Sequence, residues 1–190
     1  MINQATFPLL LALSPAFQAD PSAALERRLR KSMLRREPVT AGTLTDPYET
    51  GSSASPLRLL LATEGLEISI TTASPRILRE LDLLVELDRR HSVAVRIVIP
   101  VSRTPDAAAR LEAARRLAAE GITTRLVLAP APGARAADVR TLLAEAREDG
   151  IFDVEIDLER EPARDRSRLR AAFWSLRLEH GFPRDVPGRG

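Results

Sequence analysis

The sequence predicts an α/β fold in which parallel strands alternate with helices. Five β-like runs recur every 27 to 29 residues, beginning at Pro38, Leu66, Val93, Ile122 and Ile151. The segments between the later runs repeat their apolar residues with the period of a helix. Capping residues followed by proline mark the starts of these helices. One strand, one helix and two short loops fill about this length, so the repeat predicts successive β–α units.

The predicted strands are, in chain order, "PVTAGT", "LEISITT", "VAVRIVIPV", "ITTRLVLAP" and "IFDVEIDL". Right-handed crossovers between such strands give a parallel sheet. "VAVRIVIPV" is apolar on both faces, which suits a strand of a sheet covered by helices.

The predicted helices occupy residues 21–36, 75–90, 106–121 and 137–150, and a last helix contains Phe173, Trp174, Leu176 and Leu178. Gly121 and Gly150 lie at the ends of two predicted helices, where a residue in the left-handed conformation commonly terminates a helix. We expect the last helix to close an edge of the sheet. The capping pairs are Asp20–Pro21, Asp46–Pro47, Ser55–Pro56, Ser74–Pro75 and Thr104–Pro105, and Glu49 completes a capping box with Asp46.

The regular spacing of the five predicted strands fits either a partial (β/α) barrel or an open doubly wound sheet. The sequence has no glycine-rich phosphate loop. In both architectures ligands bind at the carboxyl ends of the strands. We predict an N-terminal segment over residues 1–19, with a substitute strand within 7–13, a repeat domain over 20–180 and a flexible tail over 181–190.

Cysteine is absent from the 190 residues, which excludes disulfides, thiolate zinc sites and a cysteine nucleophile supplied by this sequence. The two histidines, His91 and His180, have no second ligand at helical spacing, so we expect them at a surface or an interface and predict no metal site.

The charge pattern indicates a solvated surface, since 28 basic and 26 acidic residues are interleaved along the chain. This pattern does not predict a nucleic-acid-binding stripe. The apolar run from Phe7 to Leu13 is too short to span a bilayer, and no positive charge precedes it. We therefore expect a cytoplasmic protein that does not bind membranes.

Three segments resemble the radical S-adenosylmethionine superfamily, in particular its spore photoproduct lyase-like branch, whose members are also labelled DNA repair photolyases. They are "AALERRLRKSMLRREPVTAGTLTDPYE" from Ala23, which ends in "GTLTDPYE", then "TTASPRILRELDLL" from Thr71 and "RLEAARRLAAEGITTRLVLAPAPG" from Arg110. Together they lie within residues 23–133 and in the order of the family. The resemblance implies a partial (β/α) barrel with about five parallel strand–helix repeats, whose first strand is missing or replaced.

The departures from the family concern its cofactor. The family holds a four-iron cluster with a C-x-x-x-C-x-x-C loop, and this chain has no cysteine. The lysine of the family's "TKS" is Ala73 here, and the glutamine after "DPY" is Glu49. Without thiolates the cluster has no ligands from these residues, so we expect it to be absent.

The residues that could contact a ligand follow the ends of the strands. By resemblance, the end of the first of the five predicted strands, which corresponds to the barrel's second strand, faces the pocket for S-adenosylmethionine. That molecule stays a possible ligand. Capping and turn formation explain several of the same residues. The candidates are Thr43, Thr45, Asp46, Tyr48, Glu49, Thr72, Ser74, Arg103 and Asp157.

The resemblance therefore implies a protein of radical S-adenosylmethionine type that has lost its catalysis, or a product of a truncated or mis-started gene. One alternative is a cluster-independent enzyme that gathers Asp46, Glu49, Asp157 and Arg103 in one pocket. Another is a module that binds a protein partner or a second copy at an open barrel edge. A nucleic-acid partner is implied by the resemblance alone.

Overall fold

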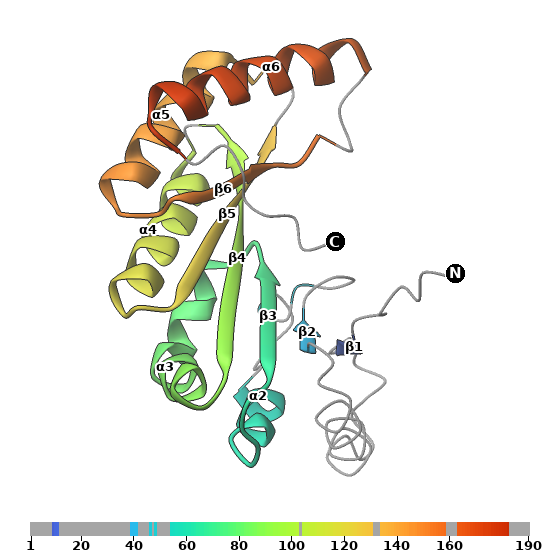
Figure 1. Ribbon diagram of the computed structural model, residues 1–190, viewed down its shortest axis with the longest axis vertical. Helices are drawn as coiled ribbons and strands as arrows, with labels where there is room; N and C mark the ends of the chain where they lie inside the picture. Colours follow the sequence, from blue (N-terminus) through green and yellow to red (C-terminus); the bar gives the residue numbers. More distant parts are fainter. Residues whose placement is uncertain are drawn as a thin grey trace. The chain divides into compact units, whose positions relative to one another are not determined.

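The computed structural model describes residues 9–11, 39–41, 46, 48, 54–102, 104–130, 134–158 and 163–182 of the chain. In this part of the chain parallel strands alternate with helices, which confirms the α/β class (Figure 1). The predicted helix over residues 21–36 lies outside the described residues. The elements are β1 (Leu9–Leu11), β2 (Val39–Ala41), α2 (Ala54–Leu60), β3 (Glu67–Thr72), the 3-10 helix η2 (Pro75–Glu80), α3 (Leu81–Arg90), β4 (Ser92–Val101), α4 (Pro105–Ala119), β5 (Thr123–Pro130), α5 (Ala136–Glu148), β6 (Asp153–Ile156) and α6 (Ala163–Glu179).

The chain divides into two compact units. Unit 1 contains the described residues up to Val95 together with Gly121–Thr123, and unit 2 contains Arg96–Glu120 and the described residues from Thr124 onward. Strand β4 is one continuous element whose residues belong to both units.

The strands pair in parallel and follow chain order. In unit 1, β1 pairs with β2 at Leu9 and Val39, and β2 pairs with β3 at Val39 and Ile68. In unit 2, β5 pairs with β6 at Arg125 and Asp153. Strand β1 lies within residues 7–13, where a substitute strand was expected, and its role as a substitute stays a prediction; each of the five predicted runs contains a strand.

Strand β4 is buried on one face. Its residues alternate between buried and half-buried from Val93 to Val101. This alternation is the pattern of a strand with one fully covered face. The buried residues of β4 are Val93, Val95, Ile97, Ile99 and Val101.

The predicted helix over residues 75–90 consists of two elements. The hydroxyl of Ser74 accepts a hydrogen bond from the N–H of Arg76 and caps η2, as its position before Pro75 predicts. At the other end of η2, the N–H of Leu81 donates to the carbonyl of Leu78, a bond of 3-10 type. The first turns are thus wound more tightly than an α-helix, and α3 begins at Leu81.

The two predicted glycine helix ends are confirmed. Gly121 follows α4 with φ +83° and Gly150 follows α5 with φ +73°. After α5, the N–H of Gly150 donates to the carbonyl of Arg147, and the N–H of Ile151 donates to that of Ala146. This pair of bonds forms a Schellman motif, which requires a left-handed residue at the glycine.

His91 is buried, so the prediction that it lies at a surface is wrong. It follows α3, and its ring joins two segments of unit 1. Nδ1 accepts a hydrogen bond of 3.2 Å from the N–H of Leu66, and Nε2 donates one of 2.9 Å to the carbonyl of Leu60. The ring therefore satisfies one backbone group at the end of α2 and one at the start of β3.

Replacement of His91 by alanine is expected to lower the free energy of unfolding by about 2 kcal/mol, because it leaves the buried N–H of Leu66 without its acceptor and removes one of the donors to the carbonyl of Leu60. Urea unfolding followed by circular dichroism measures the change. Replacement of the exposed Arg89, two residues earlier, serves as the control and is expected to change stability by less than about 0.5 kcal/mol. Equal losses for the two variants would refute the bridging role of His91.

Candidate functional site

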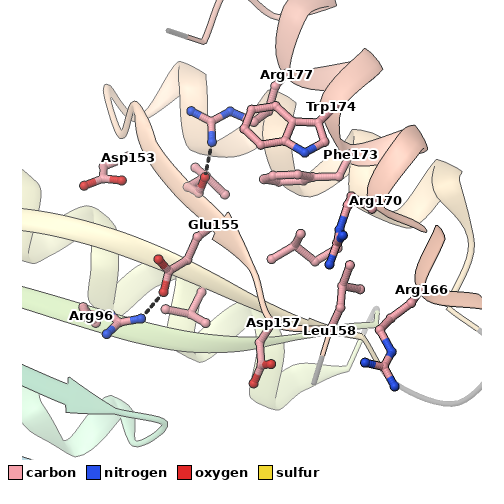
Figure 2. A pocket seen from close by; sticks show the side chains of 13 residues that line it. Arg96, Asp153, Glu155, Asp157, Leu158, Arg166, Arg170, Phe173, Trp174 and Arg177 are labelled. Atoms are coloured by element: carbon pink, nitrogen blue, oxygen red, sulfur yellow. Dashed lines mark hydrogen bonds and ion pairs between the residues drawn. The ribbon is translucent and has the colours of Figure 1, made fainter. Parts of the chain in front are cut away.

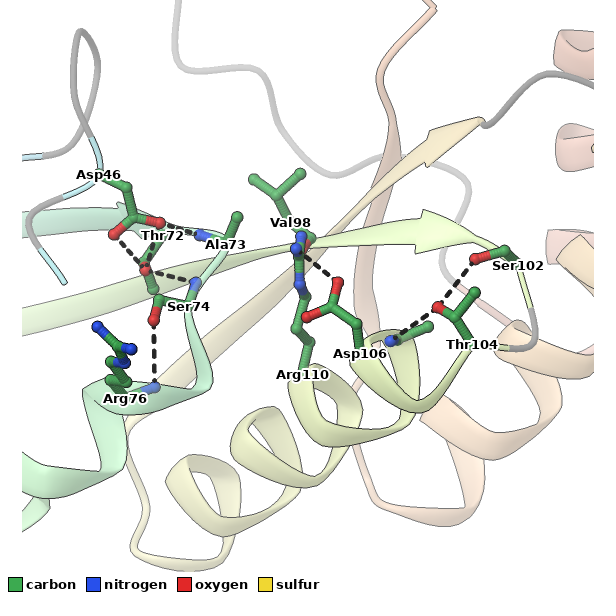
Figure 3. A network of polar contacts seen from close by, with 11 residues as sticks. Asp46, Thr72, Ala73, Ser74, Arg76, Val98, Ser102, Thr104, Asp106 and Arg110 are labelled. Atoms are coloured by element: carbon green, nitrogen blue, oxygen red, sulfur yellow. Dashed lines mark hydrogen bonds and ion pairs between the residues drawn. The ribbon is translucent and has the colours of Figure 1, made fainter. Parts of the chain in front are cut away.

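The carboxylate of Asp46 connects the segment that follows β2 to the end of β3 (Figure 3). The Thr72 hydroxyl lies 2.7 and 2.9 Å from the two oxygens of Asp46. The N–H of Ala73 donates to Oδ2 at 2.5 Å, and the N–H of Tyr48 donates to Oδ1 at 2.9 Å. Two of the three family-like segments, "GTLTDPYE" and "TTASPRILRELDLL", thus meet through one side chain.

The predicted ligand-binding residues in this network form hydrogen bonds with other residues of the network. The hydroxyl of Thr72 also accepts from the N–H of Ser74 at 2.9 Å, and Ser74 caps η2. Thr72, Ser74 and Tyr48 are buried. The capping explanation of Ser74 is thereby confirmed, whereas ligand contacts from these residues stay a prediction.

Tyr48 lies in a turn, so the described residues show no helix start at Asp46, and the next described helix begins at Ala54. The side chain of Asp46 instead accepts from the N–H of Tyr48, two residues on, in the manner of an Asx turn. Thr43, Thr45 and Glu49 lie outside the described residues, so their predicted contacts are untested.

At the end of β4, Thr104 caps α4 as its position before Pro105 predicts. Its hydroxyl accepts from the N–H of Ala107 at 3.2 Å and lies 3.3 Å from the hydroxyl of Ser102 (Figure 3). Arg103, the predicted anion-binding residue, lies outside the described residues. The predicted site with Asp46, Glu49, Asp157 and Arg103 therefore has one described member in unit 1, Asp46, and one in unit 2, Asp157.

The acidic residues of β6 form ion pairs with arginines from the neighbouring strands of unit 2. Arg96 on β4 pairs with Glu155. Arg125 on β5 pairs with Asp153 at 2.6 Å and lies 3.7 Å from Glu155. These ion pairs were not predicted from the sequence. A signal was present, because each arginine interrupts an otherwise apolar strand at a position that alternates with buried residues.

A pocket of about 730 Å³ lies between β6 and α6 in unit 2 (Figure 2). Its polar lining carries both signs of charge, and Phe173 and Trp174 add aromatic surface. Asp157 is the predicted site residue that lines it, and the N–H of Asp157 donates to the carbonyl of Leu128 at 2.8 Å. The charged residues of the lining are Arg96, Asp153, Glu155, Asp157, Arg166, Arg170 and Arg177.

Arg177 is a buried arginine on α6 that covers the edge of β6. Its guanidinium donates to the carbonyl of Val154 at 2.8 Å and lies over the rings of Trp174, Phe173 and Phe182 at 5.2, 5.5 and 5.9 Å. Burial lowers the pKa of Arg177, and the negative charge of Asp153 opposes this shift. Helix α6 thus closes the sheet edge as predicted, but through a cation that the apolar pattern did not reveal.

Comparisons with known proteins give three mycobacterial relatives without a described function. No family model matches the chain, and no solved structure matches it significantly. "Uncharacterized protein Rv2578c" of Mycobacterium tuberculosis and "Uncharacterized protein Mb2609c" of Mycobacterium bovis are each 31% identical to it over 127 residues. The match covers 60% of this chain and 37% of each relative. None of the described helices has the length and apolar character that crossing a membrane requires.

Proposed function

We propose that these residues form part of a (β/α) barrel of radical S-adenosylmethionine type that performs no radical chemistry of its own. The fold supports the proposal at a coarse level, because parallel strands follow one another in chain order with helices between them. The bond network of Asp46 adds support, since it joins two of the family-like segments at neighbouring strand ends.

The observation that carries the proposal is the set of side chains that the sequence offers as metal ligands. A four-iron cluster is held by cysteine thiolates, and the 190 residues contain none. Within the described ranges, no three histidine, aspartate or glutamate side chains gather in a way that could hold a metal ion. The residues of this chain therefore do not fit the family's cofactor, and we derive no reaction step through it.

The Asp46 carboxylate is suited to positioning rather than to proton transfer. Both of its oxygens accept hydrogen bonds from the protein, two from backbone N–H groups and the others from the Thr72 hydroxyl. A base that abstracts a proton from a substrate needs an oxygen that can reach that proton. Asp46 instead holds the ends of β2 and β3 together, which keeps the shape of a strand-end site without supplying its chemistry.

Anaerobic reconstitution with iron and sulfide tests the proposal. The protein is expected to bind no stoichiometric cluster, and incubation with S-adenosylmethionine and a strong reductant is expected to give no 5′-deoxyadenosine. A cysteine-ligated ferredoxin treated in parallel shows that the reconstitution works. A visible cluster absorbance together with 5′-deoxyadenosine above the protein-free background would disprove the proposal.

A further inference from the structure

The pocket between β6 and α6 has the size and the lining of a small-molecule site. Its volume of about 730 Å³ falls within the range of roughly 300 to 1,000 Å³ that is typical of ligand pockets. All of its lining residues belong to unit 2. The pocket is thus separate from the Asp46 network, and binding in it does not depend on the loss of radical chemistry.

Most charged groups in the pocket are already engaged with other protein groups. Arg96 pairs with Glu155, and Asp153 pairs with Arg125. Arg177 donates to the carbonyl of Val154. Arg170 differs from these residues, because it is exposed and forms no ion pair with any residue that the structure describes.

Trp174 lies one helical turn after Arg170, so both side chains line the same side of the pocket (Figure 2). Its ring is held against Phe173 with centroids 5.9 Å apart, and the guanidinium of Arg177 lies 5.2 Å from its centre. Even so, 45% of Trp174 is exposed. The pocket therefore offers a positioned aromatic surface beside a cation.

The edge of β6 adds backbone groups to the pocket. The N–H of Asp157 donates to the carbonyl of Leu128 on β5. In a parallel pair of strands, alternate residues direct their N–H and C=O groups to the same neighbour. The N–H and C=O groups of Val154 and Ile156 therefore point away from β5. The carbonyl of Val154 is taken by Arg177. Ile156 also lines the pocket, so its backbone N–H is a donor on the side of the pocket that β6 forms.

We propose that this pocket binds a small aromatic carboxylate. The carboxylate fits the planar donor fork of Arg170, and the aromatic ring of the ligand packs on Trp174. Glu155 on β6 and Asp157 just after it line the same cavity and repel a ligand of higher negative charge, such as a phosphate monoester dianion. A monoanion with an apolar ring is the chemistry that this combination favours.

Trp174 is the single tryptophan of the chain, so its fluorescence reports directly on the pocket. The full chain is titrated with 3-phenylpropionate, benzoate, acetate and the neutral 3-phenylpropanamide. Saturable changes in Trp174 emission are expected with the two aromatic carboxylates. The amide and acetate are expected to bind at least about ten-fold more weakly than 3-phenylpropionate, because each lacks either the charge or the ring.

Arg170→Gln is expected to weaken the binding of 3-phenylpropionate about ten-fold, because it removes the charged donor. Arg168→Gln, an exposed arginine of α6 outside the pocket lining, is the matched control and is expected to leave binding unchanged. Equal binding of the acid and its amide would overturn the proposal, and this comparison needs no variant. Equal losses in the two variants, or no saturable change with either aromatic carboxylate up to about 10 mM, would overturn it too.

Discussion

Replacement of Arg177 by alanine is expected to lower the free energy of unfolding by about 3 kcal/mol, one of the two largest losses we predict for a single side chain. The change leaves the carbonyl of Val154 without its donor, which costs about 1–3 kcal/mol in a buried position. It also removes the cation that lies over three aromatic rings, each such contact being worth about 0.5–2 kcal/mol. Urea unfolding followed by circular dichroism measures the loss.

Two further variants separate the contributions of Arg177. Arg168→Ala lies on the exposed side of the same helix and is expected to change stability by less than about 0.5 kcal/mol. Arg177→Met fills the same space but cannot donate, so its loss is expected to fall between those of the other two. If Arg177→Ala cost no more than Arg168→Ala, the guanidinium would not hold the edge of β6.

Replacement of Asp46, in unit 1, by alanine is expected to lower the free energy of unfolding by about 3 kcal/mol. It leaves the N–H groups of Tyr48 and Ala73 and the buried hydroxyl of Thr72 without the acceptor that they share. Glu64→Ala, an exposed acidic residue of the same unit, serves as the control and is expected to be nearly neutral.

A double-mutant cycle with Thr72→Val tests the network itself. Asp46 and Thr72 contact each other directly, so their losses are expected to be non-additive by at least about 1 kcal/mol. Additive losses within about 0.3 kcal/mol would show that the two residues act independently. In that case the end of β3 would not depend on Asp46.

The strands and most helix ends could be predicted from the sequence, because they rest on local chemistry. Thr104 and Ser74 cap their helices next to proline, and Gly121 and Gly150 end theirs in the left-handed conformation. These features need only a few neighbouring residues. The 3-10 turn of η2 could not be predicted, since the apolar period of residues 75–90 suits an α-helix throughout.

The polar residues of the interior could not be predicted for a different reason. His91 and Arg177 are of types that mostly lie at surfaces, and only the folded chain brings the carbonyls of Leu60 and Val154 to them. The same holds for the candidate site. The prediction of a site at the strand ends found Asp157, which lines the described pocket, but it missed the residues of α6, which no local pattern places beside β6.

The continuity of β4 has a practical consequence for dissecting this protein. The boundary between the two compact units falls between Val95 and Arg96, in the middle of a ten-residue strand. A gene fragment that stopped there would end in half a strand, with unpaired backbone groups that favour aggregation. Neither half of the molecule should therefore be expected to behave as an autonomous folding module.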